Sequence, residues 1–120
     1  MEILIAHFLG QTNKGRIIMI IKKQYLKSKP VCKVTFGLSG KMSESALTAH
    51  VVGEFNGWDT KATPMKKLKN GVFTVTIDLE QGREYQFRYL IDETKWENAS
   101  NADRYALTPY EDCSNSVVVL

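Results

Sequence analysis

The chain has 120 residues, of which 43% are hydrophobic, 10% aromatic and 24% charged. This composition is that of an ordinary soluble domain, and it excludes collagen-like, low-complexity and disulfide-framework proteins. The length allows one compact domain, two at most, and excludes a catalytic barrel.

The net charge of +3 is unevenly distributed along the chain. Residues 1–33 hold seven basic side chains and one acidic one, so residues 34–120 hold nine basic and twelve acidic ones. Binding to nucleic acid requires Lys and Arg clustered on the folded body, because affinity grows with the number of phosphates neutralised. The body here is mildly acidic, and the sequence therefore predicts no nucleic-acid partner.

The first 29 residues are expected to form an N-terminal extension, either a flexible tail or an added strand. Their apolar runs, such as Ile17–Ile21, are far shorter than the ~20 residues that cross a membrane. They also lack the basic start, long apolar region and small-residue cleavage site of a secretory signal. We therefore expect no membrane partner, a cytoplasmic location and one β-sandwich domain over residues 30–120.

From Val31 onward, short alternating runs predict strands separated by turns. Val31–Leu38 alternates apolar and polar residues, and a second strand is expected to turn Leu47, Ala49 and Val51 inward. Val72–Leu79 is the cleanest run. It follows an Asn-Gly pair, which tolerates the positive φ angles of a tight hairpin turn.

The next strand, Glu84–Ile91, has an aromatic-rich inward face. A short strand at Trp96-Glu97 follows, then an irregular stretch from Asn98 to Asn115, and Ser116–Leu120 closes the domain. Repeated short strands without helices between them are typical of two packed antiparallel sheets. The sequence therefore predicts an all-β, immunoglobulin-like antiparallel β-sandwich of the early-set type, with about seven strands.

Trp58 and Trp96 are unusual because neither lies on a predicted core face. A tryptophan packed in the core is the alternative for either residue. Two exposed rings beside polar turn residues suit a ligand with flat apolar faces and equatorial hydroxyls, because the rings cover C–H surface while amides and cations bond the hydroxyls. That description fits a glucan.

Other chemistry has little support in the sequence. Cys32 and Cys113 lack the spacing and the His or Cys neighbours of a zinc site, and we find no phosphate loop or nucleophile elbow. Several carboxylates lie near the tryptophans, but none is distinguished as the acid of a glycosidase pair. We therefore expect no metal, no cofactor, no catalytic residue and no enzyme activity in this chain alone.

Four features in order resemble the family-48 carbohydrate-binding modules. They are Gly53-Glu-Phe-Asn-Gly-Trp58, Tyr85-Gln-Phe-Arg-Tyr-Leu-Ile-Asp92, Trp96 and Asn115-Ser-Val-Val-Val119. That family includes the glycogen-binding domain of the AMP-activated protein kinase β subunit and the N-terminal, isoamylase-like domains of glycogen branching and debranching enzymes. The resemblance covers about residues 30–120.

The resemblance implies a carbohydrate-binding site. Trp58 and Trp96 would be its stacking platforms, Arg88 stands where the family usually has Lys, and Asn115 matches a hydroxyl-binding Asn. The sequence departs from the kinase-subunit members at Glu111 and Cys113, where those have a leucine and a threonine.

The function that this resemblance implies is non-catalytic binding of α-1,4-glucan, such as glycogen, starch or maltooligosaccharide. The module would then direct a partner enzyme of glycogen metabolism, for example a branching enzyme, to its polymer. The alternative is a family-48-like sandwich without sugar binding, which serves as a protein-interaction scaffold and docks a partner through a sheet edge or through the basic segment Arg16–Lys33.

Overall fold

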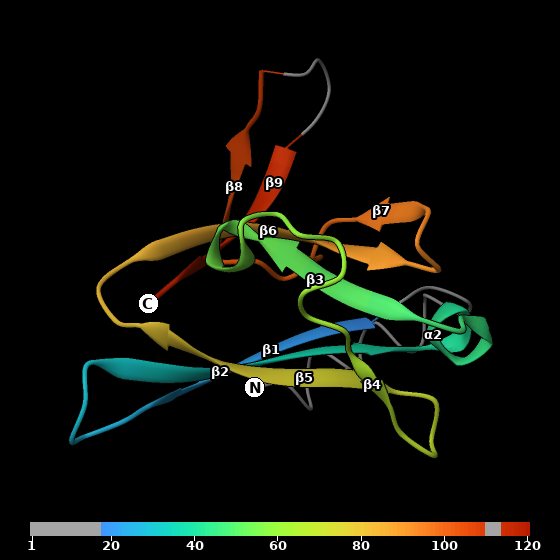
Figure 1. Ribbon diagram of the computed structural model, residues 1–120, viewed down its shortest axis with the longest axis horizontal. Coiled ribbons are helices and arrows are strands. Elements are labelled where there is room, and N and C mark those ends of the chain that lie inside the picture. The colour runs from blue at the N-terminus through green and yellow to red at the C-terminus, as the bar shows by residue number, and fades with distance from the viewer. Residues whose placement is uncertain (1–17, 110–113) are drawn as a thin grey trace.

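The computed structural model describes residues 18–109 and 114–120 of the chain. Within these ranges the strands form two antiparallel sheets, which Figure 1 shows as an upper and a lower layer. Buried side chains from both sheets make one hydrophobic core between them. The predicted all-β sandwich is confirmed.

The lower sheet has the order β1-β2-β5-β4, with β1 (Ile18–Tyr25), β2 (Val31–Ser39), β5 (Phe73–Glu80) and β4 (Lys66–Lys67). The upper sheet has the order β3-β6-β9-β8, with β3 (Ala49–Gly53), β6 (Glu84–Ile91), β9 (Ser114–Val119) and β8 (Arg104–Leu107). Strand β7 (Lys95–Glu97) pairs with β6. Two helical segments, α2 (Lys41–Ser45) and the 3-10 turn η1 (Glu54–Asn56), flank β3.

Strand β6 is central to the upper sheet, and its predicted inward face is confirmed. Tyr85, Phe87, Tyr89 and Ile91 are all buried. The Phe87 ring meets the Phe36 ring of β2 edge-on at 5.0 Å and the Tyr89 ring edge-on at 5.7 Å, an arrangement that aromatic quadrupoles favour. This packing fixes β6, and the alternation of the strand then turns its other side chains to the outer face of the sheet.

Nine strands lie in the described ranges, where the sequence predicts about seven. The prediction that Asn98–Asn115 is irregular throughout is wrong, because Arg104–Leu107 forms β8 and pairs with β9. Strand β8 is a short edge strand in which Ala106 is half-buried and the other three residues are exposed, so its sequence lacks the alternation that marks a half-buried strand. Its pairing depends on β9.

The expected inward position of Leu47 is also wrong, since 85% of its surface is exposed. Strand β3 begins only at Ala49. The backbone N–H groups of Leu47 and Thr48 instead donate to the Asp92 carboxylate, at 2.7 and 3.1 Å. These bonds hold the chain in a turn, so the alternation of the strand does not extend back to Leu47.

Part of the expected N-terminal extension is an added strand. Residues 18–25 form β1, which pairs with β2 at eight positions from Ile18↔Ser39 to Tyr25↔Cys32. Residues 1–17 lie outside the described ranges.

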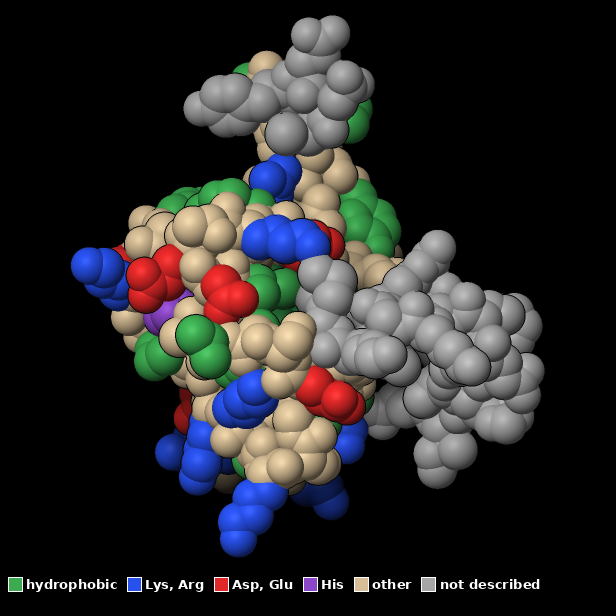
Figure 2. Space-filling view, turned by 90° about the vertical axis from the view of Figure 1, so that its right-hand side faces the viewer, with side chains coloured by type: hydrophobic (Ala, Val, Ile, Leu, Met, Phe, Trp, Pro, Cys, Tyr) green, Lys and Arg blue, Asp and Glu red, His purple; other side chains and the backbone are tan. Residues whose placement is uncertain are grey.

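Basic side chains are concentrated on the side of the lower sheet. Figure 2 shows several Lys and Arg side chains grouped at the lower end of one face of the molecule. Lys66 and Lys67 of β4 and Lys69 of the following turn are all exposed. Other lysines have acidic partners, since the Lys33 ammonium lies 3.1 Å from the Asp78 carboxylate. In the described part of the N-terminal third, Lys23 and Lys33 thus have acidic partners.

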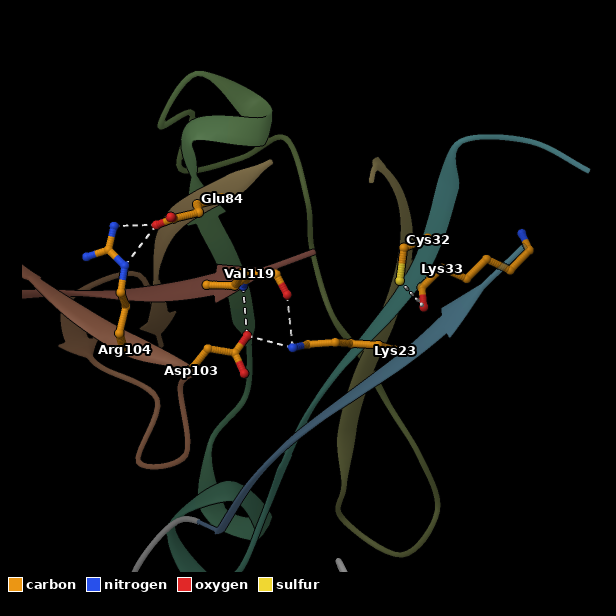
Figure 3. A network of polar contacts seen from close by, with 7 residues as sticks. All are labelled: Lys23, Cys32, Lys33, Glu84, Asp103, Arg104 and Val119. Atoms are coloured by element: carbon orange, nitrogen blue, oxygen red, sulfur yellow. Dashed lines mark hydrogen bonds and ion pairs between the residues drawn. The ribbon is translucent and has the colours of Figure 1, made fainter. Parts of the chain in front are cut away.

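A polar network joins the edge strand β1 to the upper sheet, as Figure 3 shows. The Lys23 ammonium donates to Asp103 Oδ2 at 2.7 Å and to the Val119 carbonyl at 3.0 Å. The same Asp103 oxygen accepts the Val119 N–H at 2.7 Å. Arg104 binds Glu84 beside this network and ties β8 to β6. The Lys23 contacts thus link the lower sheet to the upper sheet along one side of the sandwich.

Candidate functional site

A hollow of about 590 Å³ opens at the outer face of the upper sheet. Its wall is built from strands β6, β7, β8 and β9 and from the loop that follows η1. It brings together all four residues that the sequence predicts as ligand contacts, Trp58, Arg88, Trp96 and Asn115. The other lining residues are Glu54, Gln86, Leu107, Thr108 and Pro109.

The turn that presents Trp58 is held by the side chain of Asn56. Its Oδ1 accepts the Gly53 N–H at 3.0 Å, and its Nδ2 donates to the Val51 carbonyl and to Thr63 Oγ1 at 3.0 and 2.9 Å. These three bonds satisfy the amide group while they close the turn. The Phe-Asn-Gly-Trp sequence therefore determines where the indole lies.

Backbone geometry in this turn is restrictive at two positions. A Cβ at Gly53 would lie 2.5 Å from the Gln86 carbonyl oxygen, so only glycine allows β3 to approach β6 this closely. Trp58 itself has a φ of 59°, in the left-handed region, and its N–H donates to the Gly53 carbonyl at 2.9 Å. A left-handed conformation costs a residue with a side chain about 1–2 kcal/mol. Surrounding contacts hold Trp58 in it.

Trp96 is placed by the short strand β7, in which it lies opposite Leu90 of β6. The exposed fractions of the two tryptophans are 39% for Trp58 and 43% for Trp96. Downstream, Asn98 fastens β7 to β9, because its Oδ1 accepts the Ser116 N–H and the Ser116 hydroxyl at 3.1 and 2.9 Å. Both indoles are thus partly exposed, and hydrogen bonds of Asn56 and Asn98 hold the segments that carry them.

Arg88 extends from the outer face of β6, between the two inward residues Phe87 and Tyr89. Its Nη2 donates to the Ser114 carbonyl at 2.7 Å, and Asn98 Nδ2 donates to the same oxygen at 2.7 Å. The Arg88 Nε is buried and has no hydrogen-bond partner among the described residues. Arg88 as a whole is half-buried and lines the hollow, so its remaining guanidinium N–H groups can serve as donors to a ligand while one arm is anchored.

Asn115 is linked to Gln86, and Gln86 to Glu54. Asn115 Nδ2 donates to Gln86 Oε1 at 2.9 Å, and the Gln86 backbone N–H donates to Glu54 Oε1 at 2.8 Å. The pairing of β6 with β9 runs to Phe87↔Ser116, so Asn115 lies one residue beyond it on the outer face, next to Arg88. The floor of the hollow is thus a connected set of polar groups.

Of the five additional lining residues, Glu54 is one of the carboxylates that the sequence places near the tryptophans, and the other four were missed by reasoning from the sequence. Gln86 could have been found, because it lies two residues before Arg88 and shares its outward face. Leu107 carried a weaker signal, a leucine in an otherwise polar stretch; 92% of its surface is exposed. Glu111 and Cys113, the two departures from the family pattern, lie outside the described residues.

The lining of the hollow combines polar side chains, which form its floor, with apolar side chains, which form its walls. Its lining includes one carboxylate, Glu54, and one cation, Arg88. Behind the floor, Tyr89 is a core residue, and burial raises the pKa of its phenol, which keeps it neutral. Among the described residues no group of three or more His, Cys, Asp or Glu side chains could hold a metal ion.

The helices of the described ranges are too short and too polar to cross a membrane. The cytoplasmic location stays a prediction from the sequence.

Comparison with known proteins finds a similar protein and a matching family. A 44-residue segment is 43% identical to the 1,4-alpha-glucan branching enzyme GlgB of Photobacterium profundum. The alignment covers 36% of this chain but only 6% of that enzyme. The model of carbohydrate-binding module 48 (isoamylase N-terminal domain) matches residues 42–110. Because this match spans more than half of the chain, the protein belongs to the carbohydrate-binding module 48 family.

Proposed function

We propose that the hollow binds α-1,4-glucan without catalysing its conversion. Trp58 and Trp96 would stack on the apolar faces of glucose units, while Arg88 and Asn115 would bond their hydroxyls. The observation that carries this proposal is that both indoles, still partly exposed, line one hollow together with Arg88 and Asn115.

The apolar contribution to binding can be estimated from area. If the two indoles cover roughly 200 Å² of combined surface, burial at about 25 cal/mol per Å² contributes ~5 kcal/mol before the costs of association. Those costs remove much of it, so a short oligosaccharide should bind with roughly micromolar to millimolar affinity. A long polymer retains the module better, since it offers many overlapping sites.

The charge of the hollow is consistent with a neutral ligand. One carboxylate and one guanidinium among its lining residues leave little net charge to attract phosphate. Glucan binding through hydroxyls should therefore change little with salt, whereas nucleic-acid binding falls steeply.

The lining residues also favour binding over hydrolysis. Glycoside hydrolysis uses a pair of carboxyl groups that flank the scissile bond. Glu54 is the single carboxylate among the described lining residues, and its Oε1 already accepts a backbone N–H. The similarity to a 1,4-alpha-glucan branching enzyme supports a role in which the module holds such an enzyme, or a longer chain that contains it, on α-glucan.

Co-sedimentation with glycogen tests this function. We expect the protein to sediment with glycogen at both low and high NaCl concentration and to stay in the supernatant with cellulose. Trp96→Ala should stay in the supernatant in all cases and keep its cooperative melting transition. If the folded wild-type protein fails to sediment with glycogen, the proposal is wrong and the protein-interaction scaffold becomes the better hypothesis.

A further inference from the structure

The orientation of the Asn115 amide in the hollow is set by a neighbour to which no role has been assigned. An asparagine amide offers two donors on one side and an acceptor on the other, and the two sides exchange by a rotation of half a turn. Which side faces a sugar hydroxyl decides whether Asn115 accepts or donates a hydrogen bond. The structure directs Nδ2 toward Gln86 Oε1, at 2.9 Å.

Gln86 is itself held in place by its backbone. The Gln86 N–H donates to Glu54 Oε1 at 2.8 Å, and Gln86 lies opposite Val117 in the β6–β9 register. Its side chain leaves the same face of β6 as Arg88, and all of these polar side chains line the hollow. The backbone of Gln86 is therefore fixed, and its side chain leaves the sheet where it can meet the Asn115 amide.

We infer that Gln86 is a positioning residue that keeps the Asn115 carbonyl turned toward the ligand. This inference rests on the proposed function of the hollow. With its nitrogen directed to Gln86, Asn115 presents Oδ1 as an acceptor, and Arg88 beside it presents only donors. The site would then select a pair of neighbouring hydroxyls in which one donates to Asn115 and the other accepts from Arg88.

Two substitutions of Gln86 with opposite hydrogen-bonding polarity test this inference. Gln86→Glu keeps an acceptor, so the Asn115 nitrogen still turns to residue 86 and its carbonyl still faces the ligand. Gln86→Lys supplies only donors and should draw the Asn115 carbonyl away from the ligand. The two variants also carry opposite charges beside Arg88 and Glu54. An effect of charge persists when Asn115 is replaced, whereas an effect on the Asn115 amide is lost.

Calorimetric titration with maltoheptaose measures the affinity of each variant. We expect the affinity of Gln86→Glu to lie within about twofold of the wild-type value. Gln86→Lys should bind about threefold to tenfold more weakly, the range for one lost hydrogen bond. In an Asn115→Ala background the two variants should bind equally, because the group that they orient is gone. Melting temperatures of all variants show whether a weakened variant is folded.

Two results would overturn the inference while leaving the proposed function intact. One is equal affinity of Gln86→Glu and Gln86→Lys in a protein that binds maltoheptaose. The other is an unchanged difference between them in the Asn115→Ala background, which would mean that residue 86 acts on binding without the Asn115 amide. If the wild-type protein binds no α-glucan at all, the proposed function fails and the inference fails with it.

Discussion

The guanidinium of Arg88 is tied to the backbone of β9, since its Nη2 donates a 2.7 Å hydrogen bond to the Ser114 carbonyl. Asn98 Nδ2 donates to the same oxygen. Ser114 therefore keeps a hydrogen-bond donor when Arg88 is replaced. A substitution of Arg88 can therefore test its proposed role in binding with little effect on the stability of the fold.

We predict that Arg88→Met binds maltoheptaose about fivefold more weakly than the wild type, because charged donors to sugar hydroxyls are lost. The change in the free energy of unfolding should stay within about 1 kcal/mol, since Asn98 still satisfies Ser114. Calorimetric titration and thermal melting measure the two quantities. An unchanged affinity would remove Arg88 from the binding site.

Trp58 allows a matched pair of substitutions because of its left-handed backbone. Trp58→Ala and Trp58→Gly should both weaken maltoheptaose binding by about tenfold or more, since both remove the indole. The glycine variant should be more stable than the alanine variant by about 1 kcal/mol, because glycine adopts a positive φ without strain. Chemical denaturation compares the two. Equal stability would show that the conformation of this residue relaxes once the indole is removed.

The exposed side chain of Leu107 provides a test of the β8 wall. Leu107→Ser should weaken glucan binding by about threefold, because an apolar contact with the sugar face is lost, and should leave the melting temperature unchanged. Leu47→Ser is the matched control, since Leu47 is similarly exposed but is not part of the lining. Affinity gel electrophoresis with glycogen in the gel ranks the variants. A similar loss of retention in both would indicate a general surface effect.

The Lys23–Asp103 contact predicts that β1 contributes to the stability of the sandwich. Lys23→Met should lower the free energy of unfolding by about 1 kcal/mol, because it leaves a half-buried carboxylate and the Val119 carbonyl without their ammonium donor. Lys33→Met breaks the more exposed pair with Asp78 and should cost much less. Urea denaturation measures both. A larger effect at Lys33 would contradict this account of the network.

The sequence predicts most of the fold because its strands are strongly patterned. In β6, period-two alternation of large aromatic residues leaves one arrangement that buries them, and Tyr85, Phe87 and Tyr89 are buried as predicted. Strand β8 has no such pattern because it forms an edge strand that pairs with β9 alone. Leu47 was misplaced because its position depends on Asp92, which is 45 residues away in the sequence.

For the site, reasoning from the sequence named four residues that line the hollow, and their roles in binding stay predictions. Trp58 and Trp96 could be named because both lie beside turns and off the predicted core faces of the strands. Gln86 shares the outward face of Arg88, but its contact with Asn115 depends on which strands are neighbours and in which register, as does the place of Leu107 in the lining. That information is non-local, and it becomes visible only when β6, β8 and β9 are placed side by side.

The most direct test of glucan binding at the hollow is a titration followed by tryptophan fluorescence, because both tryptophans of the chain line it. We predict a saturable change with maltoheptaose and none with cellohexaose, a β-linked glucan of similar length. Trp58→Ala and Trp96→Ala should each reduce the affinity. No change up to several millimolar maltoheptaose, in a protein with a cooperative melting transition, would contradict the proposed function.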